Sequence, residues 1–302
     1  MLFENSMDGS DFYIGDELLF GRIINSCRYT SITDRSKFFA NYFVGRPYLL
    51  GSLGDGALSC IDQRPFMRSD VFDCVTFVVT VLALSMSSSV LDFIMNMKAL
   101  LYGDKNPDYL NRMHFISGQW NNFLSGKNIL LDITAELAGN LNDDALKLSS
   151  INLNVSEFFK NKTVDDVFLI GDCSAQDKIF ALNSLKKNAS NLLDIKSEIC
   201  FISFRDLFML PSESRCLLYS SIPGGAIFEI VRCDWGIENK IGTLLDVCHM
   251  GFIFTDNGQT TCCHASSVLG EVVSVACDEY FRSYLDIDAS SGVNIQKINY
   301  AR

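Results

Sequence analysis

The fold is decided by residues 248–266, which read CHMGFIFTDNGQTTCCHAS. At the centre of this segment, Asn257-Gly258 separates two runs of aromatic, β-branched and small side chains. Asn-Gly between such runs is the strongest short-range signal for a two-residue hairpin turn. A turn of that length pairs Asp256 with Gln259. The segment therefore predicts two antiparallel strands in the C-terminal half of the chain.

The register of this hairpin predicts which side chains share a face of the sheet. Counting back from the turn places Gly251 opposite His264 and His249 opposite Ser266. Side chains alternate between faces along a strand, so His249, Gly251 and His264 lie on one face. The two histidines are then diagonal neighbours, with backbones about 7–8 Å apart and rings within reach of each other. Gly251 would leave the space opposite His264 empty.

Regions outside the hairpin divide into a helical first part and a strand-rich second part. Helical patterns occupy residues 12–44, 74–86, 91–102, 119–124, 132–137 and 177–187, and strand patterns occupy 226–232, 248–254, 259–266 and 271–277. Helices followed by a run of strands indicate an α+β fold with an antiparallel sheet. We expect a single domain over residues 1–302, with a largely helical insertion at residues 88–205.

The helix predicted for residues 74–86 begins at a cysteine. Asp73 is a good N-cap for it, and apolar side chains recur at helical spacing at Phe77, Val81 and Leu84. A helix N-terminus stabilises a thiolate, which is the reactive form of cysteine. Most cysteines in a reduced protein are small buried side chains. Cys74 is instead predicted to be a reactive thiol.

Cys74, His249 and His264 together satisfy the requirements of a thiol hydrolase. A thiol is mostly protonated at neutral pH, so a nearby imidazole must accept its proton. A second polar group must then hold that imidazole in the correct tautomer. We predict Cys74 as nucleophile, His249 as base and His264 as the group that orients the base.

Composition and charge exclude several classes of protein. The net charge of −11 argues against a nucleic-acid binder and against an anionic membrane surface as partner. No stretch is long and apolar enough to predict a transmembrane segment. The acidic N-terminus, residues 1–16, does not resemble a signal peptide, and the 11 cysteines lack a disulfide-like spacing. We expect a cytoplasmic protein with reduced thiols, or a periplasmic or exported one if a targeting segment has been removed.

Metal binding is the competing interpretation of the cysteines beside the histidines. Cys248-His249 and Cys262-Cys263-His264 contain zinc-ligand residue types, but the alternation directs Cys248 and Cys263 away from the histidine face. The chain also has no CxxC pair. We therefore predict no metal and no cofactor.

Arginines and a loop histidine are further candidates for ligand contacts. Arg46 and Arg112 could hold a ligand carboxylate. His114 lies in a predicted loop before Trp120. That loop either contacts substrate or is simply a capped turn, and the sequence leaves both open.

Several segments in order resemble NlpC/p60 cysteine peptidases, and specifically the N-acetylmuramoyl-L-alanine amidase-like branch, also catalogued as domain of unknown function 1460. The resemblance spans about residues 39–284. The segments that carry it are FVGRPY (43–48), DCVTF (73–77), VLAL (81–84), RMHF (112–115) with Trp120, DIT (132–134), LDVCHMGF (245–252) and HASS (264–267).

The resemblance implies a papain-like NlpC/p60 core, in which N-terminal helices, including the nucleophile helix, pack on an antiparallel sheet with helical insertions. It implies the same roles for Cys74, His249 and His264. It adds Tyr48, which would lie by the thiol and, with the backbone N–H of Cys74, help to bind the oxyanion. The expected substrate contacts come from Arg46, Asp73, Arg112, His114, Trp120 and Ser266.

The predicted function is a cysteine amidase that cuts an amide bond of peptidoglycan or muropeptides, with N-acetylmuramoyl-L-alanine as the expected bond. A γ-D-glutamyl-diamino-acid endopeptidase with the same triad is the enzyme alternative. A non-catalytic module that binds muropeptides or a partner protein is the second class. Acyl or amide chemistry on a non-bacterial substrate, for example after delivery into another cell, is the third. The sequence does not indicate an oligomeric state.

Overall fold

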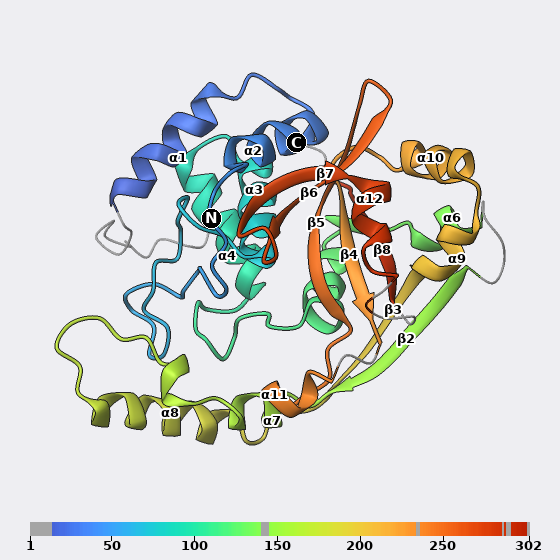
Figure 1. The fold of residues 1–302 in the computed structure, drawn as a ribbon. Helices are drawn as coiled ribbons and strands as arrows, with labels where there is room; N and C mark the ends of the chain where they lie inside the picture. Colours follow the sequence, from blue (N-terminus) through green and yellow to red (C-terminus); the bar gives the residue numbers. More distant parts are fainter. Residues whose placement is uncertain (1–13, 140–144, 234–235, 286, 288–290, 301–302) are drawn as a thin grey trace.

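In the computed structural model, the described part of the chain begins with four helices between residues 14 and 102 (Figure 1). The structure describes residues 14–139, 145–233, 236–285, 287 and 291–300. The N-terminal helices are α1 (Ile14–Ser26), α2 (Ile32–Phe43), α3 (Cys74–Met86) and α4 (Val90–Tyr102). A long loop, residues 44–73, joins α2 to α3 and ends at the cysteine.

One antiparallel sheet forms the centre of the molecule. Its strands run in the order β2-β3-β8-β4-β5-β6-β7, and the short β1 lies beside β8. The strands are β1 (Leu130–Asp132), β2 (Leu146–Leu153), β3 (Ile195–Ser203), β4 (Ala226–Arg232), β5 (Val247–Asp256), β6 (Gln259–Ser266), β7 (Glu271–Ala276) and β8 (Ser291–Ile298).

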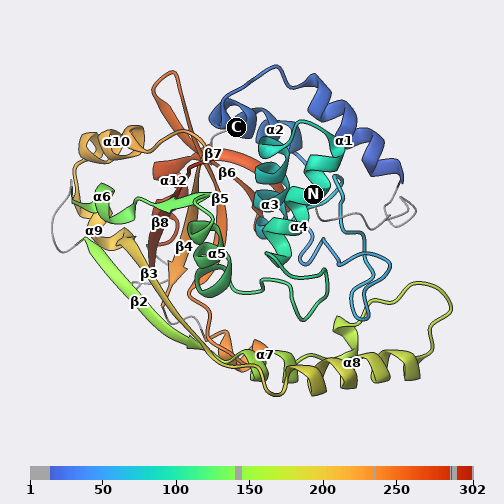
Figure 2. The ribbon, with the colours of Figure 1, turned by 180° about the vertical axis from the view of Figure 1, so that it is seen from behind.

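Further helices connect the strands. A π-helical turn, η2 (Ile116–Asn121), continues into α5 (Asn122–Gly126), and α7 and α8 form an arm below the sheet (Figure 2). The others are α6 (Thr134–Ala138), α7 (Val155–Lys160), η3 (Val164–Asp166), α8 (Ala175–Ala189), α9 (Phe204–Met209), α10 (Ser212–Ser221), α11 (Glu238–Ile241) and α12 (Cys277–Arg282).

Each face of the sheet packs against its own set of helices. On one face Phe77 of α3 meets Phe252 of β5, with ring centroids 5.9 Å apart, in a core that also contains side chains of α1, α2 and α4. On the other face Phe228 of β4 meets Phe281 of α12, at 5.8 Å, in a core shared with α6, α9 and α10. The burial of aromatic rings on both sides is a main source of the stability of such a layered fold.

Helix α3 is fixed at both of its ends. Asp73 accepts the backbone N–H of Thr76 at 2.8 Å, while the Thr76 hydroxyl accepts the backbone N–H of Asp73 at 2.9 Å, which forms a capping box. At the other end the buried Arg35 donates to the carbonyls of Leu84, Ser85 and Ser87. Helix ends need such partners because their last N–H and C=O groups have none within the helix.

The α+β architecture predicted from the sequence is confirmed, and so are most predicted elements in the C-terminal half. The segment 88–205 is less helical than expected, because it supplies β1, β2 and β3 to the same sheet. Residues 12 and 13 of the first predicted helix lie outside the described residues. Within the described part of the chain, no helix is both long and apolar enough to cross a membrane.

Candidate active site

The hairpin has the predicted register. Asp256 pairs with Gln259, and the ladder continues to Phe252 opposite Cys263. Asn257 and Gly258 take positive φ values of 49° and 81°, as a tight two-residue turn requires. His249 and His264 meet on one face, where Nε2 of His249 lies 2.8 Å from Nδ1 of His264.

Gly251 makes this meeting possible, although the space beside it is not empty. A Cβ added to Gly251 would lie 2.7 Å from Cβ of His264 and 2.7 Å from a ring carbon of Phe228. Both neighbours therefore occupy the space that a larger residue would need. The expectation of an empty space was wrong, because Phe228 of β4 fills it from the adjacent strand.

A β-bulge changes the position of Cys248. Ile230 pairs with His249 and Val231 pairs with Val247, so Cys248 is the extra residue of β5. The extra residue interrupts the alternation, and Cys248 packs against the core on the histidine side of the sheet. The prediction that Cys248 points away from that face was therefore wrong. It was correct for Cys263, which packs in the core on the α3 side.

The thiol of Cys74 lies against the backbone next to His249. The backbone N–H of Met250, the residue after His249, lies close enough to the Cys74 sulfur to lower the pKa of the thiol, and so does the N–H of Val75. Burial raises the pKa of the Cys74 thiol to about 12, the Asp73 carboxylate adds to this rise, and the Met250 N–H opposes it. The resting group is therefore a neutral thiol, with donors already in place for the thiolate.

Tyr48 lies close enough to Cys74 and Asp73 for their charges to raise the pKa of its hydroxyl. Burial, followed by the charges of Cys74 and Asp73, raises the pKa of the Tyr48 hydroxyl to about 12. The hydroxyl therefore keeps its proton at neutral pH and can donate a hydrogen bond. Tyr48 is held in place by its own backbone N–H, which donates to the carbonyl of Gly270 at 2.7 Å.

Both histidines of the pair are neutral at physiological pH. Burial lowers the pKa of His264 to about 4, and burial together with the neighbouring His264 lowers that of His249 to about 3. A single hydrogen then lies between Nε2 of His249 and Nδ1 of His264. If His249 donates it, Nδ1 of His249 is left as a free acceptor.

A pocket of about 210 Å³ opens beside the two imidazoles. Ser266 lines it and accepts the backbone N–H of Leu269 at 3.0 Å. Two tyrosines that the sequence did not indicate also line it. The ring centroid of Tyr280 lies 4.3 Å from that of His264, and the hydroxyls of Tyr280 and Tyr284 are 2.9 Å apart. Both tyrosines come from α12 and the turn after it, and nothing in the sequence marked that helix.

Asp73 and Arg46 differ in the hydrogen bonds that their side chains form within the protein. The two carboxylate oxygens of Asp73 accept the N–H groups of Thr76 and Gly51, each at 2.8 Å. This makes Asp73 a structural cap of the nucleophile helix. Arg46 is half-buried, its backbone carbonyl accepts the N–H of Val272 at 2.8 Å, and its guanidinium forms no hydrogen bond with the described residues.

The side chains of the remaining expected substrate contacts are engaged by other groups of the protein. The Arg112 guanidinium pairs with the buried carboxylates of Asp55 and Asp62. His114 packs among aromatic rings with Nε2 at 2.7 Å from the carbonyl of Tyr109, and burial lowers its pKa to about 3. Trp120 is 1% exposed and donates to the carbonyl of Leu100. These three side chains do not line the pocket beside the histidines. Of all the predicted site residues, only His249, His264 and Ser266 line it.

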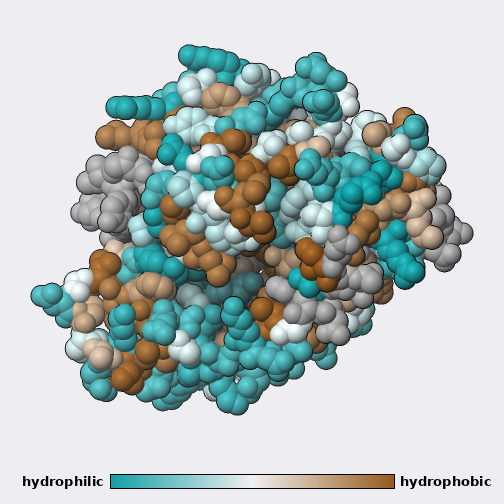
Figure 3. Space-filling model, in the orientation of Figure 1, coloured by the Kyte–Doolittle hydropathy of each residue, from teal (hydrophilic) through white to brown (hydrophobic). Residues whose placement is uncertain are grey.

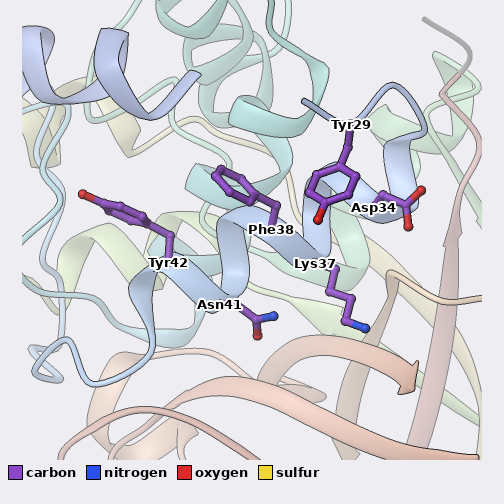
Figure 4. A pocket seen from close by; sticks show the side chains of 6 residues that line it. All are labelled: Tyr29, Asp34, Lys37, Phe38, Asn41 and Tyr42. Atoms are coloured by element: carbon purple, nitrogen blue, oxygen red, sulfur yellow. The ribbon is translucent and has the colours of Figure 1, made fainter. Parts of the chain in front are cut away.

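Other features of the surface do not join this site. A shallow pocket of about 410 Å³ lies along α2 and the loop before it, and it shares no residue with the histidine pocket (Figure 4). The face seen in Figure 3 is hollowed between the main body and the lower arm.

Among the described residues, no group of three or more His, Cys, Asp or Glu side chains is arranged to hold a metal ion.

Comparison with known proteins gives a family match over most of the chain. The family model described as AmiA-like, N-acetylmuramoyl-L-alanine amidase-like, matches residues 38–289. A crystal structure of a Legionella pneumophila protein from the family of domain of unknown function 1460 is 32% identical, with a TM-score of 0.86 and 95% of each chain covered. No curated protein matches the chain.

More distant structures share the fold. An N-acetylmuramoyl-L-alanine amidase from Bacteroides uniformis is 20% identical, with a TM-score of 0.59, covering 89% of this chain and 99% of its own. A Bacteroides fragilis structure with a provisional xylanase description is 23% identical, with a TM-score of 0.56, covering 86% and 99%. At these identities the likeness concerns the fold alone.

Proposed function

Because the chain belongs to the N-acetylmuramoyl-L-alanine amidase-like family, we propose that it is a cysteine amidase acting on peptidoglycan or its fragments. We further propose that the bond it cuts joins N-acetylmuramic acid to L-alanine, and that its sheet and nucleophile helix form a papain-like NlpC/p60 core. The observation that carries this proposal is the meeting of three elements. The N-terminus of α3 supplies Cys74, whose sulfur lies by the backbone N–H of Met250, the residue after His249 on β5. β6 supplies His264, at 2.8 Å from His249.

The first step is attack of the Cys74 sulfur on the substrate carbonyl carbon. His249 accepts the thiol proton at Nδ1 as the carbon–sulfur bond forms. Since burial keeps Cys74 protonated and His249 neutral, the proton moves during the attack and not before it. The N–H groups of Met250 and Val75 favour negative charge on the sulfur and so lower the barrier to this transfer.

The second step expels the amine. The imidazolium of His249 donates its proton to the leaving nitrogen as the carbon–nitrogen bond breaks, which leaves a thioester on Cys74. Water, deprotonated by His249, then attacks the thioester carbon and releases the carboxylic acid with regeneration of the thiol. His264 accepts the Nε2 hydrogen of His249 throughout, which keeps Nδ1 of His249 directed at the reaction.

The oxyanion formed in each attack needs hydrogen-bond donors. The Tyr48 hydroxyl remains protonated and lies near Cys74, whose charge affects its pKa. It is therefore suited to this role together with the backbone N–H of Cys74. The pocket beside the two imidazoles is lined by His249, His264 and Ser266 but not by Cys74 or Tyr48, and in this proposal substrate approaches the base from its side.

The products of peptidoglycan digestion test the proposal. Sacculi and purified muropeptides are incubated with the protein, and the products are identified by mass spectrometry. The proposal predicts free stem peptides that begin with L-alanine, and glycans whose lactyl groups end in a carboxylic acid. A new amine on the diamino acid would instead identify a γ-D-glutamyl endopeptidase. Undigested sacculi that co-sediment with the protein would identify a binding module.

A further inference from the structure

Two buried thiols of this chain lie in contact with each other. The sulfur of Cys262, on β6, is 2.9 Å from the sulfur of Cys277, the first residue of α12. Both side chains are 0% exposed and pack in the core on the histidine face of the sheet. The sulfurs are already closer than non-bonded sulfur atoms normally approach, and a disulfide bond would bring them to about 2.05 Å.

The position of this pair links it to the candidate active site. His264 follows Cys262 by two residues on the same face of β6, and Tyr280 follows Cys277 by one turn of α12. The ring centroids of Tyr280 and His264 are 4.3 Å apart. The thiol pair and the ring pair are therefore two contacts between the same strand and the same helix.

We propose that Cys262 and Cys277 form a disulfide when the chain folds in the presence of a small-molecule disulfide, and that this bond fastens α12 to β6. The bond would hold Tyr280 against His264 and so keep the orienting member of the triad in place. The proposal does not depend on which bond the enzyme cuts.

The reaction is a thiol–disulfide exchange with a reagent such as oxidised glutathione. One protein thiolate attacks the reagent and forms a mixed disulfide, which releases one glutathione thiolate. The second protein thiolate then attacks the protein sulfur of the mixed disulfide and releases the second glutathione. The two cysteines lose two protons and two electrons, and the reagent is reduced to two thiols.

Because the two thiols are buried in the folded protein, the exchange is expected during folding and not after it. Burial raises the pKa of the Cys262 thiol well above its usual range, so in the folded protein it is a poor nucleophile that the reagent does not reach. We therefore expect the bond to form during folding and to form slowly, if at all, when the reagent is added to folded protein.

The test refolds the protein with reduced and oxidised glutathione, then unfolds it in an alkylating reagent and measures the intact mass. The expected result is alkylation of two fewer thiols than the 11 that fully reduced protein shows, with a loss of two hydrogens. Closure of a short loop should also raise the thermal midpoint on the order of 5 °C relative to reduced protein.

Three variants identify the partners. Cys262 and Cys263 are adjacent, so a peptide map alone does not separate them. Cys263→Ala is the matched control, because Cys263 is equally buried but packs on the opposite face. The crosslink should persist in Cys263→Ala and be lost in Cys262→Ala and Cys277→Ala. Alkylation of every cysteine in refolded wild-type protein, or a crosslink that survives Cys277→Ala, would overturn the proposal.

Discussion

Nε2 of His249 lies 2.8 Å from Nδ1 of His264, and the two ring planes are perpendicular. This hydrogen bond joins adjacent strands across a glycine, and with His249 as its donor, Nδ1 of His249 is the nitrogen that can accept a proton. The mechanism follows from it, because a base that rotates or changes tautomer cannot serve a fixed thiol.

Removal of the orienting imidazole should slow the reaction without abolishing it. His264→Ala leaves Nε2 of His249 without an acceptor, and we expect kcat to fall by about 10²- to 10⁴-fold. His264→Asn keeps a side-chain oxygen that can accept the hydrogen, so it should recover part of the loss. Steady-state kinetics on a purified muropeptide measures both. If His264→Ala matched wild type, His264 would not orient the base.

Gly251 should be intolerant of any side chain. A Cβ at this position would lie 2.6 Å from the carbonyl oxygen of Cys263 and 2.7 Å from Cβ of His264. Gly251→Ala should therefore cost about 1–3 kcal/mol of stability and reduce kcat by displacing His264. Gly126→Ala is the control, because no atom lies within 4 Å of its added Cβ. Denaturant unfolding with parallel kinetics checks both variants, and equal behaviour of the two would contradict the packing argument.

The acid limb of the pH profile should lie well below the range of an ordinary histidine. Burial lowers the pKa of His249 to about 3 and that of His264 to about 4, so both remain neutral as the pH falls through 6.5. We expect kcat/KM to change little between about pH 5 and about pH 7. A profile measured on a soluble muropeptide, with circular dichroism as a folding control, tests this. An acid limb centred near pH 6.5 would show that the base is exposed.

The sequence predicted the parts of the site that depend on local pattern. The Asn-Gly turn and the alternation along 248–266 correctly predicted that the rings of His249 and His264 meet, and Asp73 marked the start of α3. It did not predict β8, since Asn294 and Gln296 interrupt the apolar pattern of that strand. Both are buried because they hydrogen-bond, Asn294 to Asp132 at 2.7 Å and Gln296 to Asn294 at 2.9 Å.

The position of Cys248 and the role of α12 could not be predicted because both depend on contacts between different elements of the fold. The bulge that turns Cys248 toward the histidine face arises from the pairing of β4 with β5, which no local pattern records. Tyr280 reaches His264 only because α12 packs back onto β6. Conversely, Arg112 and His114 lie in a conspicuous loop motif, yet their side chains are engaged by Asp55, Asp62 and the carbonyl of Tyr109.

The buried carboxyl group of Glu229 should make the free energy of unfolding depend on pH at values above the usual pKa range of carboxyl groups. Burial raises the pKa of Glu229 to about 8, and its Oε1 has no hydrogen-bond partner among the described residues. The folded state thus binds a proton that the unfolded chain releases near pH 4.5, so this group's contribution to stability decreases as the pH rises from there through 8.

Glu229→Gln should remove that dependence. The amide is neutral at every pH and keeps an oxygen to accept the N–H of Asn121, which donates to Glu229 at 2.8 Å. We expect the variant to be more stable than wild type at pH 9, on the order of 1–3 kcal/mol, with a smaller difference at pH 5. Urea unfolding at both pH values provides the measurement. A difference that was larger at pH 5 would have the wrong sign for a carboxyl with a raised pKa.

The central claim is that the Cys74 sulfur is the nucleophile, and comparison of two cysteine variants tests it most directly. Cys248 is the matched control, because it also lies beside the histidine pair but at a bulge of β5 and not at a helix N-terminus. The measurement is release of new amine ends from purified sacculi by wild type, Cys74→Ala and Cys248→Ala at equal concentration. The account predicts a loss of at least about 10⁴-fold for Cys74→Ala and near-normal turnover for Cys248→Ala. Normal turnover by Cys74→Ala would contradict it.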